Sequence, residues 1–189
     1  MLRNNRKLHR GFTLIELLVV IVILGILATI GLTFFTSSQM RGRDSKRKSD
    51  LKQISAALEI YYSDYAAYPI SKEGMIIGCP SGVGGGACGW GVSEFTDGKT
   101  SYMRIVPADP SGGQTYFYRT LTVNSVANQG FQLYARLENP QDINCLPDEN
   151  GIPSCDNPSI PDGVNCNNGV CNFAVTSPNV SAADLGEDG

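Results

Sequence analysis

An uninterrupted apolar run near the start of the chain constrains its fold more than any other feature. The run spans 24 positions, from Phe12 to Phe35, broken only by Glu16, three threonines and two glycines. As a helix it would be about 36 Å long, and the hydrocarbon core of a bilayer is about 30 Å thick. We therefore expect residues 12–35 to form a membrane-spanning and assembly helix. Glu16 is costly in such a segment, because a carboxylate in hydrocarbon needs a positive partner.

A peptide-bond cut after Gly11 would supply that partner. The new amine of Phe12 would lie four residues from Glu16, on the same face of the helix. The amine and the carboxylate would then pair within one subunit or between neighbouring subunits. The competing interpretation is an ordinary signal peptide, whose apolar region is only about 7–15 residues long and has no use for an acid.

The block Gly11-Phe12-Thr13-Leu14-Ile15-Glu16, preceded by a basic leader (residues 1–11), resembles the prepilin processing motif of type IV pilins and type II secretion pseudopilins. The resemblance implies a prepilin peptidase that cuts between Gly11 and Phe12 and methylates the Phe12 amine. It also implies that Glu16 pairs with such an amine during assembly. The implied partners are the peptidase, other copies of this chain with related minor pilins, an inner-membrane assembly platform and membrane lipid. The implied location is the bacterial inner membrane, as a single-pass precursor with its head outside, and afterwards a periplasmic or cell-surface filament.

The charge and the histidine content of the chain exclude several functions once the leader is removed. The leader holds four of the 15 basic residues, which leaves 11 against 18 acidic residues. An acidic product argues against nucleic-acid binding, which depends on neutralising phosphates. The sole histidine, His9, also lies in the leader, so the remaining chain lacks the histidine of serine or cysteine triads and of common zinc sites. We expect no enzyme activity, no catalytic residue and no cofactor.

Cysteine usage indicates export of the part beyond the apolar run. An even number of cysteines in a loop-rich region is typical of disulfides made in an oxidising compartment, which places the leader in the cytoplasm. Zinc ranks far below disulfides, because no C-x-x-C pair is present. Six cysteines allow 15 pairings, so connectivity stays open. Proximity alone suggests the near-neighbour pairs Cys79–Cys88, Cys145–Cys155 and Cys166–Cys171.

The pattern beyond the apolar run remains helical to about residue 67. An apolar stripe with spacings of three and four residues must lie against a core, and it consists of Leu51, Ile54, Leu58, Tyr61 and Tyr65. Pro69 is expected to end the helix. No such stripe exists between Ser37 and Asp50. We therefore expect residues 36–67 to be an exposed stalk that becomes the spine of a head, with the basic run Arg41–Lys52 as a solvated face.

Residues 68–189 are expected to form a globular head. Three segments have the composition of strands, Tyr116–Val123, Phe131–Leu137 and Asn172–Thr176, and the second alternates as a half-buried strand does. From Asn139 to Gly169, turn formers and cysteines predict disulfide-stapled loops. The fold class is α+β: a long N-terminal helix, membrane-spanning in its first half, packed against a small antiparallel β-sheet. The pilin resemblance implies the same order of elements.

Together these features predict a structural subunit of a type IV-type filament, processed by a prepilin peptidase and polymerised through its N-terminal helix. The alternatives are a type II secretion pseudopilin, which is a periplasmic piston subunit, and a membrane-anchored extracellular binding domain. Calcium is a minor possibility for the loops, although the spacing of their acids fits no EF-hand. Those acids are Asp142, Asp148, Glu149, Asp156 and Asp162.

Overall fold

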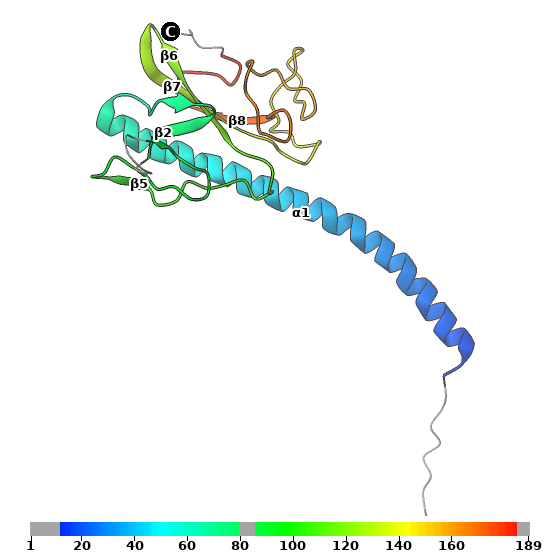
Figure 1. Ribbon diagram of the computed structural model, residues 1–189. Helices are drawn as coiled ribbons and strands as arrows, with labels where there is room; N and C mark the ends of the chain where they lie inside the picture. The colour runs from blue at the N-terminus through cyan, green and yellow to red at the C-terminus, as the bar shows by residue number, and fades with distance from the viewer. Residues whose placement is uncertain (1–11, 80–85, 185–189) are drawn as a thin grey trace, which may run out of the picture. The chain divides into compact units, whose positions relative to one another are not determined.

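The computed structural model describes residues 12–79 and 86–184 and has an α+β architecture, with one long helix followed by short strands (Figure 1). The chain divides into two units, Met1–Gln39 and Met40–Gly189. The expected leader, residues 1–11, lies outside the described residues. Within the described residues, we find no helix with the length and apolar character needed to cross a membrane.

The helix α1 runs from Leu14 to Tyr65, 52 residues, so the expected continuous helix is confirmed with ends two residues inside the expected ones. It ends because Ala66 adopts the left-handed conformation, with φ of 53°. The N–H of Ala66 donates to the carbonyl of Tyr62 at 2.7 Å, which satisfies one of the last free carbonyls of the helix. The chain therefore leaves the helix three residues before Pro69, and the proline is not the cause of the stop.

The described strands form three small antiparallel sheets instead of the single sheet expected. The first sheet contains β1 (Ser71–Lys72), β2 (Met75–Cys79) and β3 (Gly86–Ala87), and the second contains β4 (Phe95–Thr96) and β5 (Ser101–Met103). The third contains β6 (Phe117–Val123), β7 (Val126–Ala135) and β8 (Phe173–Thr176), with β7 in the centre. This third sheet is the one that the sequence predicted.

The sheet of β6, β7 and β8 is built on a tight hairpin. Asn124 and Ser125 join β6 to β7 with φ values of 51° and 62°, as a two-residue type I′ turn requires. Because the loop is so short, β7 begins at Val126, five residues before the start expected from the alternation pattern. β8 then pairs antiparallel with the end of β7, with Leu133 opposite Val175.

The main core lies between the C-terminal half of α1 and the strands of the head, in the unit Met40–Gly189. Leu51, Ile54 and Leu58 are at most 1% exposed, which confirms the predicted apolar stripe, and full burial contributes about 1.5–3 kcal/mol for each such side chain. Tyr61 is partly buried against the same core. Tyr65 is the exception: it is 48% exposed, because it is the last residue of the helix.

The prediction that Phe131–Leu137 is a half-buried strand is wrong, because β7 is buried on both faces. Gln132 and Tyr134 point away from the main core, yet both are fully buried. The C-terminal segment covers them: Gln132 Nε2 donates to the carbonyl of Ser181, and the Tyr134 hydroxyl donates to the carbonyl of Ala182, each at 2.6 Å. A second apolar cluster thus forms on this face around Tyr134, Val164, Cys166 and Cys171.

Three disulfides join all six cysteines, as Cys79–Cys88, Cys145–Cys155 and Cys166–Cys171. Each is a near-neighbour pair, and the Cα–Cα distances are 5.1, 5.1 and 5.3 Å. The first joins the end of β2 to the residue after β3. The other two lie in the irregular segment between β7 and β8.

The prediction of an exposed stalk and a solvated basic face is wrong for the part of α1 that belongs to the head. Asp44, Arg47 and Asp50 are at most 2% exposed. Their spacing of three residues places them along one side of the helix, in line with the apolar stripe that follows. They are buried because loops of the head bring opposite charges to them, as described below.

Candidate functional site

The start of α1 is closed by a reciprocal capping box. The backbone N–H of Thr13 donates to Glu16 Oε2 at 2.9 Å, and the Thr13 hydroxyl donates to the same oxygen at 2.6 Å. In return, the N–H of Glu16 donates to Thr13 Oγ1 at 3.3 Å. This pattern satisfies free N–H groups of the first turn, and the positive end of the helix dipole favours the carboxylate there. Glu16 is therefore held in place by its own helix.

The first part of α1 exposes apolar side chains on all sides. Between Phe12 and Leu27, every Leu, Ile, Val and Phe side chain is 45–83% exposed. Soluble monomers rarely expose contiguous apolar surface of this extent, and larger exposed patches mark contacts with proteins or membranes. The chemistry available to this segment is therefore burial against other apolar groups.

The sequence-predicted processing residues lie at and before this capped end. Gly11 is outside the described residues. Phe12 is 78% exposed and precedes the helix, and Glu16 is the acid of the first turn. The cleavage between Gly11 and Phe12, the methylation of Phe12 and the assembly role of Glu16 stay predictions.

A buried charge cluster, which we call the Arg47 cluster, joins α1 to two segments of the head. It contains Asp44, Arg47, Asp109, Ser111 and Glu138. The fully buried guanidinium of Arg47 donates to Asp44 from Nη1 at 2.8 Å and to Asp109 from Nε at 2.7 Å. Its Nη2 lies 2.7 Å from Glu138 Oε1 and donates to Ser111 Oγ at 2.8 Å.

Asp44 and Arg43 complete the attachment at the end of β7. The two carboxylate oxygens of Asp44 accept the backbone N–H groups of Glu138 and Asn139, both at 2.9 Å. Arg43 forms a bidentate pair with Glu138, in which Nε donates to Oε1 at 2.8 Å and Nη2 to Oε2. A paired network of this kind is strongly destabilised when one partner is removed, because a buried charge is left behind.

The charges of the Arg47 cluster hold one another ionised. The hydrogen bond from Arg43 lowers the pKa of Glu138 to about 2, and the bonds from Arg47 and Ser111 act in the same direction against burial. Burial alone would lower the pKa of Arg47, but its hydrogen bonds to Asp109 and Glu138 raise it above its ordinary value. Arg47 and Glu138 are therefore both charged at neutral pH.

Asp50 extends the line of buried charges toward the apolar core. Its carboxylate accepts a hydrogen bond from the Tyr116 hydroxyl at 2.9 Å and one from Lys46 Nζ at 3.1 Å. Burial first, and the bond to Asp50 second, raise the pKa of the Tyr116 hydroxyl well above its ordinary value. This row of charges was not predicted from the sequence. The available signal was the pattern of acid, base and acid at intervals of three residues.

The loop acids considered for calcium have other roles in the structure. Asp142 pairs with Lys48 at 2.6 Å, and Asp148 accepts the N–H groups of Asn150 and Ile152, which closes a turn. In residues 12–79 and 86–184, no group of three or more His, Cys, Asp and Glu side chains is placed to hold a metal ion.

A comparison with known protein families matches the start of the chain. Residues 6–32 match the prokaryotic N-terminal methylation motif. These residues include the block around Gly11, Phe12 and Glu16.

Comparisons with individual proteins extend beyond that motif. The chain is 36% identical to the type II secretion system core protein G of Pseudomonas aeruginosa over 109 residues, which are 57% of this chain and 71% of that protein. It is 31% identical to the core protein G of Escherichia coli over 55% of this chain and 68% of that protein. It is also 42% identical to the type IV major pilin protein PilA of Myxococcus xanthus, over 32% of this chain and 27% of that protein. No solved structure matches the chain.

Proposed function

This chain belongs to the family of the type II secretion system core protein G, and from that membership we propose that it is a structural subunit of a pilin-like filament. A prepilin peptidase would process the precursor, and the mature chain would polymerise through the first part of α1. In this role the chain is a substrate of the peptidase, and it catalyses no reaction itself.

The exposed apolar surface of α1 is the observation that carries this proposal. Thirteen large apolar side chains between Phe12 and Leu27 are at least 45% exposed in the single chain. Each contributes about 1.5–3 kcal/mol when it is fully buried, so packing many such helices together is strongly favourable. If the chain were instead a binding domain on an ordinary membrane anchor, this helix would not need to pack against other subunits.

Glu16 has the capacity to accept a second partner. A carboxylate offers about four acceptor positions, and Thr13 occupies two hydrogen bonds on one oxygen. The remaining positions would receive the methylated amine of Phe12, from the same or an adjacent subunit. A carboxylate buried among apolar helices without such a cation would be strongly destabilising, so the pair would select correctly processed subunits.

We propose that residues 12–35 hold the precursor in the inner membrane before assembly. The run of 24 nearly uninterrupted apolar positions in the sequence supports this anchor, and the disulfides support a head that lies outside the cytoplasm. The partners would be the peptidase, the assembly platform and other filament subunits.

The final location of the filament separates two forms of the proposal. The identity to core protein G over about seven tenths of its length favours a periplasmic pseudopilus of a secretion system. The identity to a major pilin favours a surface fibre, but it covers only 27% of that pilin. Labelling of filaments on intact cells, together with a secretion assay on a deletion strain, distinguishes the two.

The first experiment compares Glu16→Gln with the unchanged chain in the native host. Glutamine keeps the size of the side chain but removes its charge, so we expect normal membrane insertion and loss of most filament, measured by shearing for a surface fibre and by cross-linking of subunits in whole cells for a periplasmic one. Glu149→Gln is the matched control, because Glu149 is exposed and lies in a loop of the head.

Mass spectrometry of the mature chain gives the second readout. We expect a chain that begins at methylated Phe12 in both variants. An intact N-terminus, or wild-type filament yield from Glu16→Gln, contradicts the proposal.

A further inference from the structure

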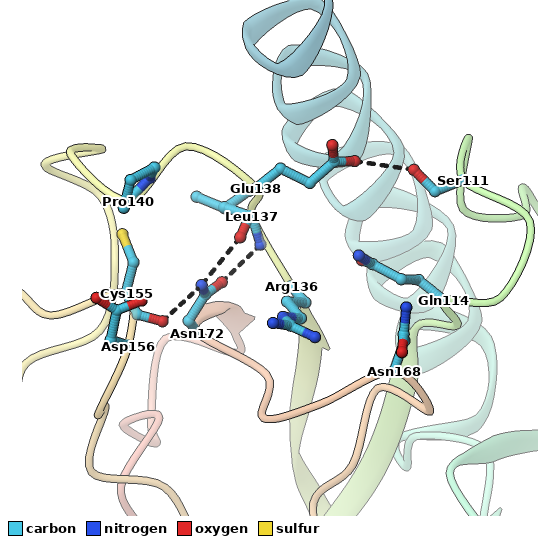
Figure 2. Close-up of a pocket in the computed structure, with 10 residues that line it drawn as sticks. All are labelled: Ser111, Gln114, Arg136, Leu137, Glu138, Pro140, Cys155, Asp156, Asn168 and Asn172. Carbon is cyan, nitrogen blue, oxygen red and sulfur yellow. Dashed lines mark hydrogen bonds between the residues drawn. The ribbon is translucent and has the colours of Figure 1, made fainter. Parts of the chain in front are cut away.

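The head contains a cleft of about 390 Å³ that the filament function does not use. It lies beyond the end of β7, where the irregular segments before β6 and before β8 meet (Figure 2). Its lining is mostly polar and includes Ser111, Gln114, Arg136, Asp156 and Asn168. The polar side chains of this cleft offer hydrogen-bond donors and acceptors to a ligand that complements them.

Arg136 has no charge partner in this cleft. Within the described residues, its guanidinium forms no hydrogen bond or ion pair, although the residue is half-buried. Figure 2 shows it between Asn172 on one side and Gln114 and Asn168 on the other. A guanidinium carries five N–H donors in a planar fork, which matches a carboxylate.

Gly169 lies directly beside this guanidinium. A Cβ atom at position 169 would lie 2.2 Å from Arg136 Nη1 and 2.7 Å from its Cζ, so only glycine allows the close approach. Gly169 also has φ of 128°, a conformation that other residues rarely adopt, and it lies in the loop closed by Cys166–Cys171. The loop closed by the disulfide therefore leaves room for the guanidinium on this side of the cleft.

The same cleft contains an unused acceptor. Gln114 Oε1 is buried and has no hydrogen-bond partner among the described residues. An unpaired buried acceptor costs about 1–3 kcal/mol. In contrast, Asn172 is saturated: it donates to the carbonyls of Leu137 and Cys155 and accepts from the N–H of Leu137 (Figure 2). In this cleft Asn172 is therefore held by the backbone, whereas the guanidinium of Arg136 is unpaired.

We propose that this cleft binds a carboxylate-bearing saccharide residue, such as a hexuronate of an acidic polysaccharide. The carboxylate pairs with Arg136, and a ring hydroxyl donates to the exposed carboxylate of Asp156. Asn168 offers an amide that both donates and accepts, as hydroxyl groups require. An acidic peptide fits less well, because it lacks the hydroxyl donors with which a saccharide can bond the carboxylate of Asp156 at the rim.

A second cleft supports an extended saccharide. The linings of the two clefts are adjacent in the chain, since Gln114 and Asn168 line the first and Thr115 and Asn167 line the second. The second cleft, of about 490 Å³, is lined by Trp90, Asn165 and Asn167, among others. An aromatic ring beside amide side chains suits the apolar face and the hydroxyls of a neighbouring sugar.

Isothermal titration of the full mature chain in detergent tests the proposal. The probes are trigalacturonate, the neutral trisaccharide maltotriose and the peptide acetyl-Glu-Glu-Glu-amide, which carries as many carboxylates as trigalacturonate. We expect saturable binding of trigalacturonate and much weaker binding of the other two. Arg136→Gln should weaken trigalacturonate binding by about tenfold or more, as expected for loss of a charged hydrogen-bond donor.

Arg104→Gln is the matched control, because Arg104 is exposed and lies outside the cleft lining. It removes the same charge and should leave the affinity within about twofold. Circular dichroism and a free-thiol count verify that each variant is folded and oxidised. No binding of trigalacturonate, equal binding of the peptide, or equal effects of the two arginine variants would each overturn the proposal.

Discussion

Replacing Arg47 by methionine should destabilise the head by about 3–5 kcal/mol, the usual cost of breaking a buried ion pair from one side. Methionine fills most of the space but leaves Asp44, Asp109 and Glu138 without their shared cation. The cost stays below the sum of the lost bonds, because Asp44 keeps two backbone donors and Glu138 keeps Arg43. Since small domains are stable by about 5–15 kcal/mol, the variant should lose a large part of its stability.

Urea unfolding with the disulfides intact measures this loss through the fluorescence of Trp90, the only tryptophan. Its ring packs edge-on against Tyr116, with a centroid distance of 5.7 Å, so it reports on the head. Arg41→Met is the control on the same helix, because Arg41 is exposed. It should change the free energy of unfolding by less than about 0.5 kcal/mol.

The pH dependence gives the sharper test of the reasoning. The pKa of Glu138 is lowered to about 2, from an unfolded value of about 4.3. Its stabilising effect is therefore complete above the unfolded pKa and is lost as the pH falls toward 2. Arg43 is the largest cause of this shift and remains in Arg47→Met, so the difference between the two proteins should be full at neutral pH and should lose only the share due to Arg47 below about pH 4. A difference under about 1 kcal/mol at pH 7, or one that does not change with pH, would refute a buried ionic origin.

Three further variants probe other parts of the head by the same unfolding titration. Asn172→Ala removes three hydrogen bonds to the backbone and should cost about 1–3 kcal/mol; an unchanged midpoint would show that water replaces them. Replacing Cys145 and Cys155 together by serine opens a short loop and should cost roughly 3 kcal/mol, whereas a loss near zero would mean that the loop stays ordered when reduced. Tyr116→Phe removes the 2.9 Å hydrogen bond to Asp50 and should cost about 1–2 kcal/mol, and a stabilised variant would contradict this role.

The parts of the fold that follow from local spacing were predictable from the sequence. The helix and its apolar stripe depend on neighbours three and four residues apart, and Leu51, Ile54 and Leu58 are buried as expected. The strands β6 and β8 begin within one residue of the expected starts. The strands β1, β3, β4 and β5 have two or three residues each, too few for a pattern of alternation to be detected, and the five-residue β2 was not predicted either.

The buried charges were not predictable in the same way, because their partners are distant in the sequence. Arg47 meets Asp109 from 62 residues away, and Arg43 meets Glu138 from 95 residues away. A periodicity analysis assigns charged residues to solvent, so a charged stripe on a helix is taken for an exposed face. Similarly, β7 is buried on both faces because residues about 50 positions later fold back over it.

In the candidate site, too, local features could be predicted from the sequence and contacts between distant segments could not. The capping residues and the exposed apolar helix could be located from a short motif. The cleft around Arg136 could not be predicted, because its residues come from four separate loops and strand ends. The unpaired state of Arg136 is a property of packing, which only the folded structure displays.

The three cross-links of the head each join cysteines that are 5 to 10 positions apart. During export, each cysteine therefore meets its correct partner almost as soon as both have emerged from the membrane. Oxidation can proceed in the order of emergence, without waiting for distant segments and with little need for reshuffling. A head built this way matures piece by piece, and its cross-links do not tie the helix to the rest of the domain.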